Sequence, residues 1–330
     1  MAPTLTDVAK RANVALSTAS RAFSDPRRLG SETLRKVLAA AQEIGYDPGS
    51  GRQTDSAPEP RTSTVAIVVP DIANPIFGAF VKAAQGEVWR GRQTLVLHDT
   101  DFAPEREREA IGHLRTKADA IVMCSARLEA EEIIELCGRT PVLLVNREAE
   151  GTDCILADAA DGLRQTIDYL AALGHTRIAY VQGSEHSWSN RRRVALVRTL
   201  TAEAGLELAV LGWQSETVAG GAAAAASVVA SGASAAITHN DLVAFGVIEG
   251  ARALGVEVPA GLSVVGIDDI SLAEVSRPSL TSIAVPWARA GSLSLELLGP
   301  VLAGDRRLPR KHRLPTQLVV RGSTGPAPAR

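Results

Sequence analysis

From residue 65 onward, short apolar segments alternate with amphipathic segments of helical length, and this alternation restricts the fold more than any other feature. The apolar segments are residues 65–70, 94–98, 120–124, 142–145, 178–181, 210–213, 235–238 and 264–267. Helical periodicity separates most of them, at residues 77–90, 161–173, 190–204, 219–230 and 240–254. Strands that alternate with helices form parallel sheets covered on both faces. Eight such strands fit two doubly wound sheets better than one, so the sequence predicts an α/β body.

The first 48 residues carry helical patterns instead. Thr4, with Asp7 three residues later, predicts the N-terminal cap of a first helix. A second short helix is expected over residues 16–23, and a third follows a predicted cap at Ser31. Two short helices around a tight turn, braced by a third, form a helix-turn-helix, whose second helix enters the major groove of DNA. A three-helix bundle with a polar surface is the alternative.

The charge distribution favours the DNA-binding interpretation. Residues 1–52 carry eight basic and five acidic side chains, whereas the rest of the chain carries 27 and 32. A basic head on an acidic body is typical of a head that meets a polyanion. The second helix supplies hydroxyls and a guanidinium, which hydrogen-bond to base edges and phosphates. The candidate DNA-binding residues are Thr4, Thr6, Leu16, Ser17, Thr18, Ser20, Arg21 and Arg28.

Polar side chains also follow the predicted strands of the body. They are Asp71, Ser125, Asn146, Asn240 and Asp268. Ligands of open α/β sheets bind at the carboxyl ends of strands, so we expect these side chains to converge on one cleft. With the guanidinium of Arg193, they offer the mixed donors and acceptors that suit the vicinal hydroxyls of a sugar, polyol or nucleoside. For each residue alone, a satisfied loop or capping role is the alternative.

Several function classes are disfavoured by what the sequence lacks. No segment approaches the roughly 20 apolar residues of a membrane helix, and no apolar signal-peptide core follows Met1, so we expect a cytoplasmic protein without a membrane partner. Three cysteines without CxxC spacing exclude a disulfide scaffold and a zinc finger. Dinucleotide-binding, P-loop and hydrolase-elbow motifs are absent, so no catalytic residue, cofactor or metal site is expected.

The opening segment, TLTDVAKRANVALSTASRA at residues 4–22, resembles the signature of the lactose/galactose-repressor (LacI/GalR) family of bacterial transcription regulators. The third helix and its end, residues 31–38 and 44–48, are also similar. The body continues the resemblance at residues 69–77, 173–179, 239–241, 263–269 and 278–283, the last of which the resemblance assigns to a return to the first sheet. Nearly the whole chain therefore resembles this family.

The resemblance implies a type I periplasmic-binding-protein fold, in which two sheets are hinged around a small-molecule cleft. The implied domains are a helix-turn-helix domain at 1–48, a linker at 49–64 and an effector-binding and dimerisation domain at 65–330. Within the last, the N-subdomain would cover about 65–159 and 287–330, and the C-subdomain about 160–286.

The resemblance also implies further roles in the cleft. Ile76 and Phe77 would pack on the apolar face of the effector, and Ser189 and Gln214 would add polar contacts. The implied function is a homodimeric, ligand-responsive repressor of a near-palindromic operator, with a sugar, polyol or sugar derivative as effector. The alternative is a cytoplasmic sugar-binding sensor whose helical head binds a protein partner.

The chain departs from the family pattern at two places. Ala15 stands where the family usually places a Ser that caps the recognition helix. Residues 49–64 contain no Leu, Ile, Met or Phe, and Pro58 and Pro60 oppose a continuous helix. Relatives usually carry a Leu-containing linker helix that kinks the operator through the minor groove. We therefore expect this chain to bend its operator less.

Overall fold

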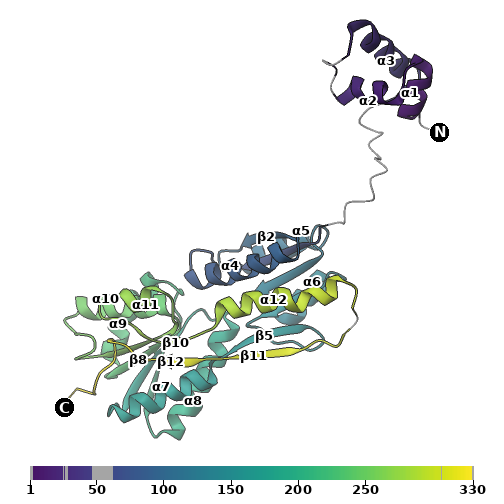
Figure 1. Cartoon of the computed structure of the whole chain (residues 1–330). Coiled ribbons are helices and arrows are strands. Elements are labelled where there is room, and N and C mark those ends of the chain that lie inside the picture. Colours follow the sequence, from purple (N-terminus) through teal and green to yellow (C-terminus); the bar gives the residue numbers. More distant parts are fainter. Residues whose placement is uncertain (1–2, 25, 27–28, 47–61, 306, 329–330) are drawn as a thin grey trace. The chain divides into compact units, whose positions relative to one another are not determined.

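The structure is a computed structural model that describes residues 3–24, 26, 29–46, 62–305 and 307–328 (Figure 1). The chain divides into two compact units, Met1–Arg61 and Thr62–Arg330, which we call the head and the body. Most of the expected linker, at 49–64, lies outside the described residues.

The described residues of the head form three α-helices, and they are α1 (Leu5–Ala12), α2 (Leu16–Ser24) and α3 (Ser31–Glu43). Thr4 caps α1 in a reciprocal capping box with Asp7, as the sequence predicted. Gly30 is the cap residue of α3, so the predicted cap at Ser31 was wrong by one position, and the serine begins the helix instead. Small apolar side chains from all three helices, including Val8, Ala19 and Val37, form the core of the head.

The first sheet of the body has the strand order β11-β5-β4-β3-β1-β2, with every pairing parallel. Its strands are β1 (Thr64–Val69), β2 (Thr94–Asp99), β3 (Ala120–Cys124), β4 (Val142–Val145), β5 (Asp153–Asp158) and β11 (Lys311–Pro315). Its helices are α4 (Pro75–Arg90) and α12 (Trp287–Leu302), which pack together, and α5 (Pro104–Leu114) and α6 (Ala130–Cys137). Alternate residues of β1 serve opposite faces: Ile67 joins the apolar cluster of Phe80, and Val68 joins that of Ile111.

The second sheet has the order β12-β10-β9-β8-β6-β7, and only the β10–β12 pairing in it is antiparallel. Its strands are β6 (Arg177–Val181), β7 (Glu207–Leu211), β8 (Ala235–Thr238), β9 (Ser263–Asp268), β10 (Thr281–Ala284) and β12 (Gln317–Val319). Its helices are α7 (Ala159–Ala172), α8 (Trp188–Glu203), α9 (Val218–Ala230), α10 (Asp241–Ala253) and the short α11 (Leu272–Val275). Helices therefore cover a wholly or mainly parallel sheet in each half of the body, as the alternation predicted.

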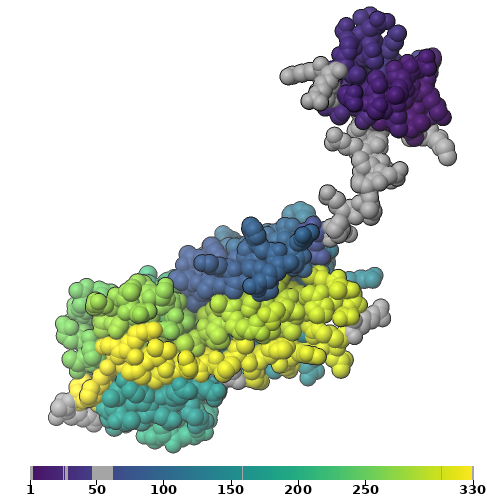
Figure 2. Space-filling model, in the orientation of Figure 1, coloured from purple at the N-terminus to yellow at the C-terminus, as the bar shows by residue number. Residues whose placement is uncertain are grey.

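Three connections join the two sheets: β5 to α7, β10 to α12, and β11 to β12. Figure 2 shows the yellow C-terminal segment running from one half of the body to the other. Two expectations are corrected here. Residues 278–283 were expected to return to the first sheet, but β10 pairs with β9 in the second. Residues 287–330 were expected to stay with the first sheet, but β12 and the tail pair with the second, where Val264 N–H donates to Ser323 O at 2.8 Å.

The contact between α4 and α12 requires a glycine. A Cβ atom at Gly291 of α12 would lie 2.1 Å from the backbone oxygen of Phe80 on α4, whereas one at the exposed Gly86 of α4 would meet no packed neighbour within 4 Å. We expect Gly291→Ala to lower the free energy of unfolding by about 1–3 kcal/mol, because the two backbones must separate. Gly86→Ala should leave it unchanged or raise it by up to about 1 kcal/mol.

Urea unfolding of the two variants, followed by far-UV circular dichroism, measures this difference. Equal stability of the two variants would contradict the close approach of α4 and α12.

Candidate functional site

The carboxyl ends of the strands of both sheets surround one small cavity of about 30 Å³, which we call the cleft. A volume of this size holds only one or two water molecules. Eight of the ten predicted effector residues line it, and they are Ile76, Phe77, Ser125, Asn146, Ser189, Arg193, Asn240 and Asp268. Asp71 and Gln214 are not among its lining residues. The Asp71 carboxylate instead accepts Ala73 N–H at 2.8 Å, and the Gln214 amide donates to Gly212 O at 3.4 Å.

Asp268 stands at the end of β9 and is 6% exposed. Its carboxylate accepts Trp287 Nε1–H at 3.1 Å. Burial raises the pKa of Asp268 to about 7, although the nearby charge of Arg193 and the Trp287 hydrogen bond act to lower it. Arg193, on α8, donates to the backbone oxygen of His239 at 2.7 Å. The cleft thus holds a buried acid and a buried guanidinium on different elements.

The two asparagines of the cleft also have structural roles. Asn240 Oδ1 caps α10 by accepting Val243 N–H at 2.9 Å, and its Nδ2 donates to Glu216 O at 3.2 Å. Asn146 Oδ1 accepts Ala157 N–H at 3.0 Å. The side chains are thereby held in fixed orientations at the cleft, which a binding site requires.

Three strand ends in the cleft adopt positive φ angles, which are uncommon for residues other than glycine. The angles are 52° at Ser125, 54° at Asn146 and 122° at Asp268. Such conformations cost free energy and concentrate at functional sites. At each of these three residues the backbone changes direction as the strand ends, and the φ angle there sets the orientation of the side chain.

Other residues of the cleft were missed by the sequence analysis, and they are Asn74, Arg127, Ser187, Glu216, His239 and Trp287. Arg127 and Glu216 form a buried ion pair with an Nη2–Oε2 distance of 2.9 Å. Arg127 lies two residues after the predicted candidate Ser125, and Glu216 two residues after Gln214. The sequence therefore did contain a signal for Arg127 and Glu216, because both are charged residues in loops that follow strands.

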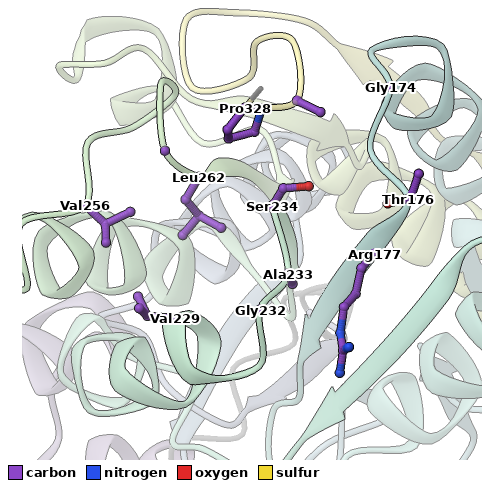
Figure 3. A pocket seen from close by; sticks show the side chains of 12 residues that line it. Gly174, Thr176, Arg177, Val229, Gly232, Ala233, Ser234, Val256, Leu262 and Pro328 are labelled. Carbon is purple, nitrogen blue, oxygen red and sulfur yellow. The ribbon is translucent and has the colours of Figure 1, made fainter. Parts of the chain in front are cut away.

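A larger cavity, of about 510 Å³, lies at the opposite ends of the strands of the second sheet (Figure 3). Its lining includes Gly174, Thr176, residues 232–234 and residues 261–262, which precede β6, β8 and β9, and Arg177, which begins β6. Its polar side chains are already engaged: Arg177 pairs with Glu207, and the Ser234 hydroxyl bonds to His175. Because ligands of parallel sheets bind at the carboxyl ends, the smaller cleft is the better candidate site.

In the head, one face of α2 is exposed and mostly polar. Leu16, Ser17, Ser20 and Arg21 are exposed, Thr18 is half-buried, and the opposite face packs through buried Ala19 and Ala22. The Ala15 carbonyl accepts the first backbone bonds of α2, at 2.9 Å from Thr18 N. Thr6 is exposed, the Thr4 hydroxyl is engaged with Asp7 at 2.6 Å, and Arg28 lies outside the described residues.

The described part of the chain holds no cluster of three or more His, Cys, Asp or Glu side chains arranged for a metal ion. Over the same residues, every helix is too short or too polar to cross a membrane.

Comparison with protein-family models identifies both units. Residues 4–49 match the model described as bacterial regulatory proteins, lacI family, and residues 167–324 match a periplasmic binding protein-like domain. The chain therefore combines a lacI-family helix-turn-helix domain with a periplasmic binding protein-like domain. It is 28% identical to the HTH-type transcriptional regulator DegA of Bacillus subtilis over 336 residues, which cover 99% of each protein. It is 29% identical to the regulator GalR of Escherichia coli over 317 residues, covering 93% of this chain and 91% of GalR.

Solved structures share the fold of this chain. A lac repressor dimer bound to operator and the anti-inducer ONPF aligns with a TM-score of 0.72 and 23% identity, covering 98% of this chain and 100% of the repressor. A complex of the transcriptional regulator CelR with cellobiose aligns with a TM-score of 0.71 and 26% identity, covering 97% of this chain and 99% of CelR. The helical head and two-sheet body are therefore the fold of the lac repressor.

The raised pKa of Asp268 predicts a pH dependence. Because its pKa is about 7 in the native state, against an ordinary value of 3.8 in the unfolded chain, the native protein keeps a proton that the unfolded chain releases between these pH values. The stability contributed by this group is therefore complete below about pH 4 and is lost as the pH rises towards 7. The Asp268→Asn variant has no ionisable group at this position, so it does not lose this stability. The free energy of unfolding of the variant relative to the wild type should therefore rise by about 1 kcal/mol or more between pH 4.5 and 8.

Urea unfolding of both proteins at several pH values provides the measurement. A stability difference that stays constant across this range would show that Asp268 is ionised in the folded protein throughout.

Proposed function

We propose that this lacI-family protein is a cytoplasmic, ligand-responsive transcriptional repressor without catalytic activity. It binds operator DNA through α2 and a small carbohydrate-like effector in the cleft. One observation carries the proposal: a head with an exposed polar recognition helix is joined in one chain to a body whose strand ends converge on a buried acid and guanidinium, Asp268 and Arg193. Neither cofactor nor metal is needed for this function.

The relatives support the regulatory part. DegA and GalR carry the names of transcriptional regulators, and CytR of Escherichia coli, 26% identical over 335 residues, is named a transcriptional repressor. The solved CelR structure is a complex with cellobiose, and a lacI-family regulator from Enterococcus faecium was solved with bound ribose. A sugar, polyol or sugar derivative is accordingly the proposed effector. The alternative of a sugar sensor with a protein-binding head has less support, because the lacI-family match covers the head.

The proposed DNA complex is a homodimer on a near-palindromic operator. One recognition helix reads too few base pairs for a unique site, and two-fold symmetry doubles the footprint. Arg21, Ser17 and Ser20 are exposed on the side of α2 opposite its buried alanines, which suits them to base edges and phosphates. The domains proposed are 1–48 for DNA, 49–64 as linker and 65–330 for effector binding and dimerisation.

Arg21→Ala should weaken operator binding by about tenfold or more, because a lost guanidinium contact to a base or phosphate costs roughly 1–3 kcal/mol. An operator selected from random DNA with the full-length protein serves as the target in a salt-titrated mobility-shift assay. Arg164→Ala, which removes an exposed arginine of α7 in the body, is the matched control and should bind normally. Unchanged operator affinity of the Arg21 variant would exclude α2 as the recognition helix.

Arg193→Ala should abolish the response to effector while operator affinity persists. A ligand shifts DNA affinity only through its preference for one state of the cleft, so a lost contact removes the coupling. A thermal-shift screen of sugars, polyols, sugar acids and purine nucleosides finds the ligand, because a ligand of the native state stabilises it. We expect the affinity of that ligand to fall about tenfold or more, since hydrogen bonds from a charged donor are among the stronger ones. If Arg193→Ala loses operator binding but still binds the ligand, the assignment of Arg193 to effector binding is wrong.

A further inference from the structure

The Arg127–Glu216 ion pair spans the cleft between the two sheets. Arg127 follows β3 of the first sheet, and Glu216 follows β7 of the second. Their side chains are 3% and 10% exposed, and Arg127 Nη2 donates to Glu216 Oε2 at 2.9 Å. The cavity that remains beside them has a volume of only about 30 Å³. The pair therefore lines a cavity that is too small, as it stands, for a sugar-sized molecule.

The loop that carries Arg127 is firmly anchored. The Glu107 carboxylate accepts the backbone N–H groups of Arg127 and Leu128 at 2.8 and 2.9 Å. Buried Arg147 donates to Ala126 O at 2.9 Å. The guanidinium of Arg127 also lies over the ring of Phe102, 4.9 Å from its centroid. A side chain held in this way is preorganised for binding.

One N–H donor of the Arg127 guanidinium has no partner in the structure. It belongs to the Nε atom, which is buried. A guanidinium can donate through Nε and an Nη atom together to two oxygens of one carboxylate or phosphate. Glu216 accepts a hydrogen bond only from Nη2, so the Nε–H group of Arg127 is left for another acceptor.

The buried charges of the cleft favour an anion. Arg127 and Arg193 are both buried guanidiniums. Opposite them stand the carboxylates of Glu216 and of Asp268, whose pKa burial raises to about 7, so that near neutral pH it is only partly ionised. His239 Nε2 lies 3.4 Å from Glu216, and burial lowers the pKa of His239 to about 4, so this ring is neutral. At neutral pH the cleft therefore carries an excess of positive charge.

We propose that Arg127 is a specificity-determining residue that binds a carboxylate or phosphate group of the effector, and that Glu216 competes with this group for the guanidinium. The inference rests on the proposed effector function of the cleft. A neutral sugar that separated Arg127 from Glu216 would leave a buried guanidinium without a counter-ion, whereas an anionic group replaces the lost carboxylate. Ser184 N–H, 3.4 Å from Glu216, and His239 remain beside Glu216 when Arg127 is taken. Asp268 and Arg193 are left to hold the hydroxyls of the same molecule.

Substitutions of the two partners should act in opposite directions. Glu216→Gln removes the competing charge at nearly constant shape, so anionic ligands should bind about tenfold more tightly than to the wild type. Arg127→Gln should abolish their binding, alone and in combination with Glu216→Gln. Arg108→Gln, which breaks the exposed pair of Arg108 with Glu132 in the same half of the body, is the control and should bind like the wild type.

The probes are D-gluconate, D-glucose 6-phosphate and inorganic phosphate, with D-glucose and sorbitol as neutral counterparts, each tested on the full-length protein by thermal shift and calorimetry. Binding of gluconate alone identifies a carboxylate effector, and binding of the phosphates identifies a phosphorylated one. Glu216→Ala provides a second variant without the competing charge should the glutamine variant not fold.

The proposal is overturned if no anion stabilises either Glu216 variant, or if Glu216→Gln weakens the binding of anions as much as Arg127→Gln does. A neutral sugar that binds both the wild type and Arg127→Gln, but not Arg193→Ala, would overturn this inference and leave the proposed effector site standing. Failure of the protein to bind any selected operator would instead count against the proposed regulatory function.

Discussion

Parallel pairing is the constraint on which the structure depends, because it delivers the carboxyl ends of neighbouring strands to one edge of a sheet. In both sheets of the body that edge faces the cleft, and lining residues follow β1, β3, β4, β6, β7, β8 and β9. The ladder hydrogen bonds are the same for any side chains, so the loops after the strands are free to differ. Ser125, Asn146 and Asp268 exploit this freedom with positive φ angles at their strand ends.

Burial converts this arrangement of polar side chains into a site with unusual electrostatics. Taking a carboxylate or guanidinium out of water is unfavourable unless a partner replaces the lost solvent. Burial raises the pKa of Asp268 and lowers that of His239, and each shift favours the neutral form of the side chain. Arg127 is instead paired with the carboxylate of Glu216. The same low polarity that makes these groups costly to bury also strengthens each contact with a ligand, which is how a few side chains can discriminate between similar molecules.

The sequence predicted the architecture well and the cleft in part. Apolar segments such as 120–124 have the continuous hydrophobicity of strands buried on both faces, and the structure contains β3 there. The edge strands β11 and β12 lack that signal: β11 reads Lys311-His312-Arg313-Leu314-Pro315 and is half-exposed, and β12 is three residues long, so neither was predicted. Eight cleft residues could be predicted because they follow strands or match the family pattern. Arg127 and Glu216 also lie in loops that follow strands, but their pairing could not be predicted, because it is a contact between loops 89 residues apart in sequence.

The connection from β11 to β12 has a mechanical consequence. β11 ends at Pro315 in the first sheet and β12 begins at Gln317 in the second, with only buried Thr316 between them. Gly162, at the start of the α7 crossing, donates its N–H to the Thr316 hydroxyl at 3.3 Å, and a Cβ atom there would lie 2.4 Å from Ile283. A rotation of one sheet against the other can be taken up by a few dihedral angles at this tightly packed pivot without breaking a strand pairing. The two sheets are thus joined at a crossing so tightly packed that a side chain larger than that of glycine has no room at position 162. If the sheets turn against each other, the movement must be concentrated in the few residues of this crossing, as in other hinged domains.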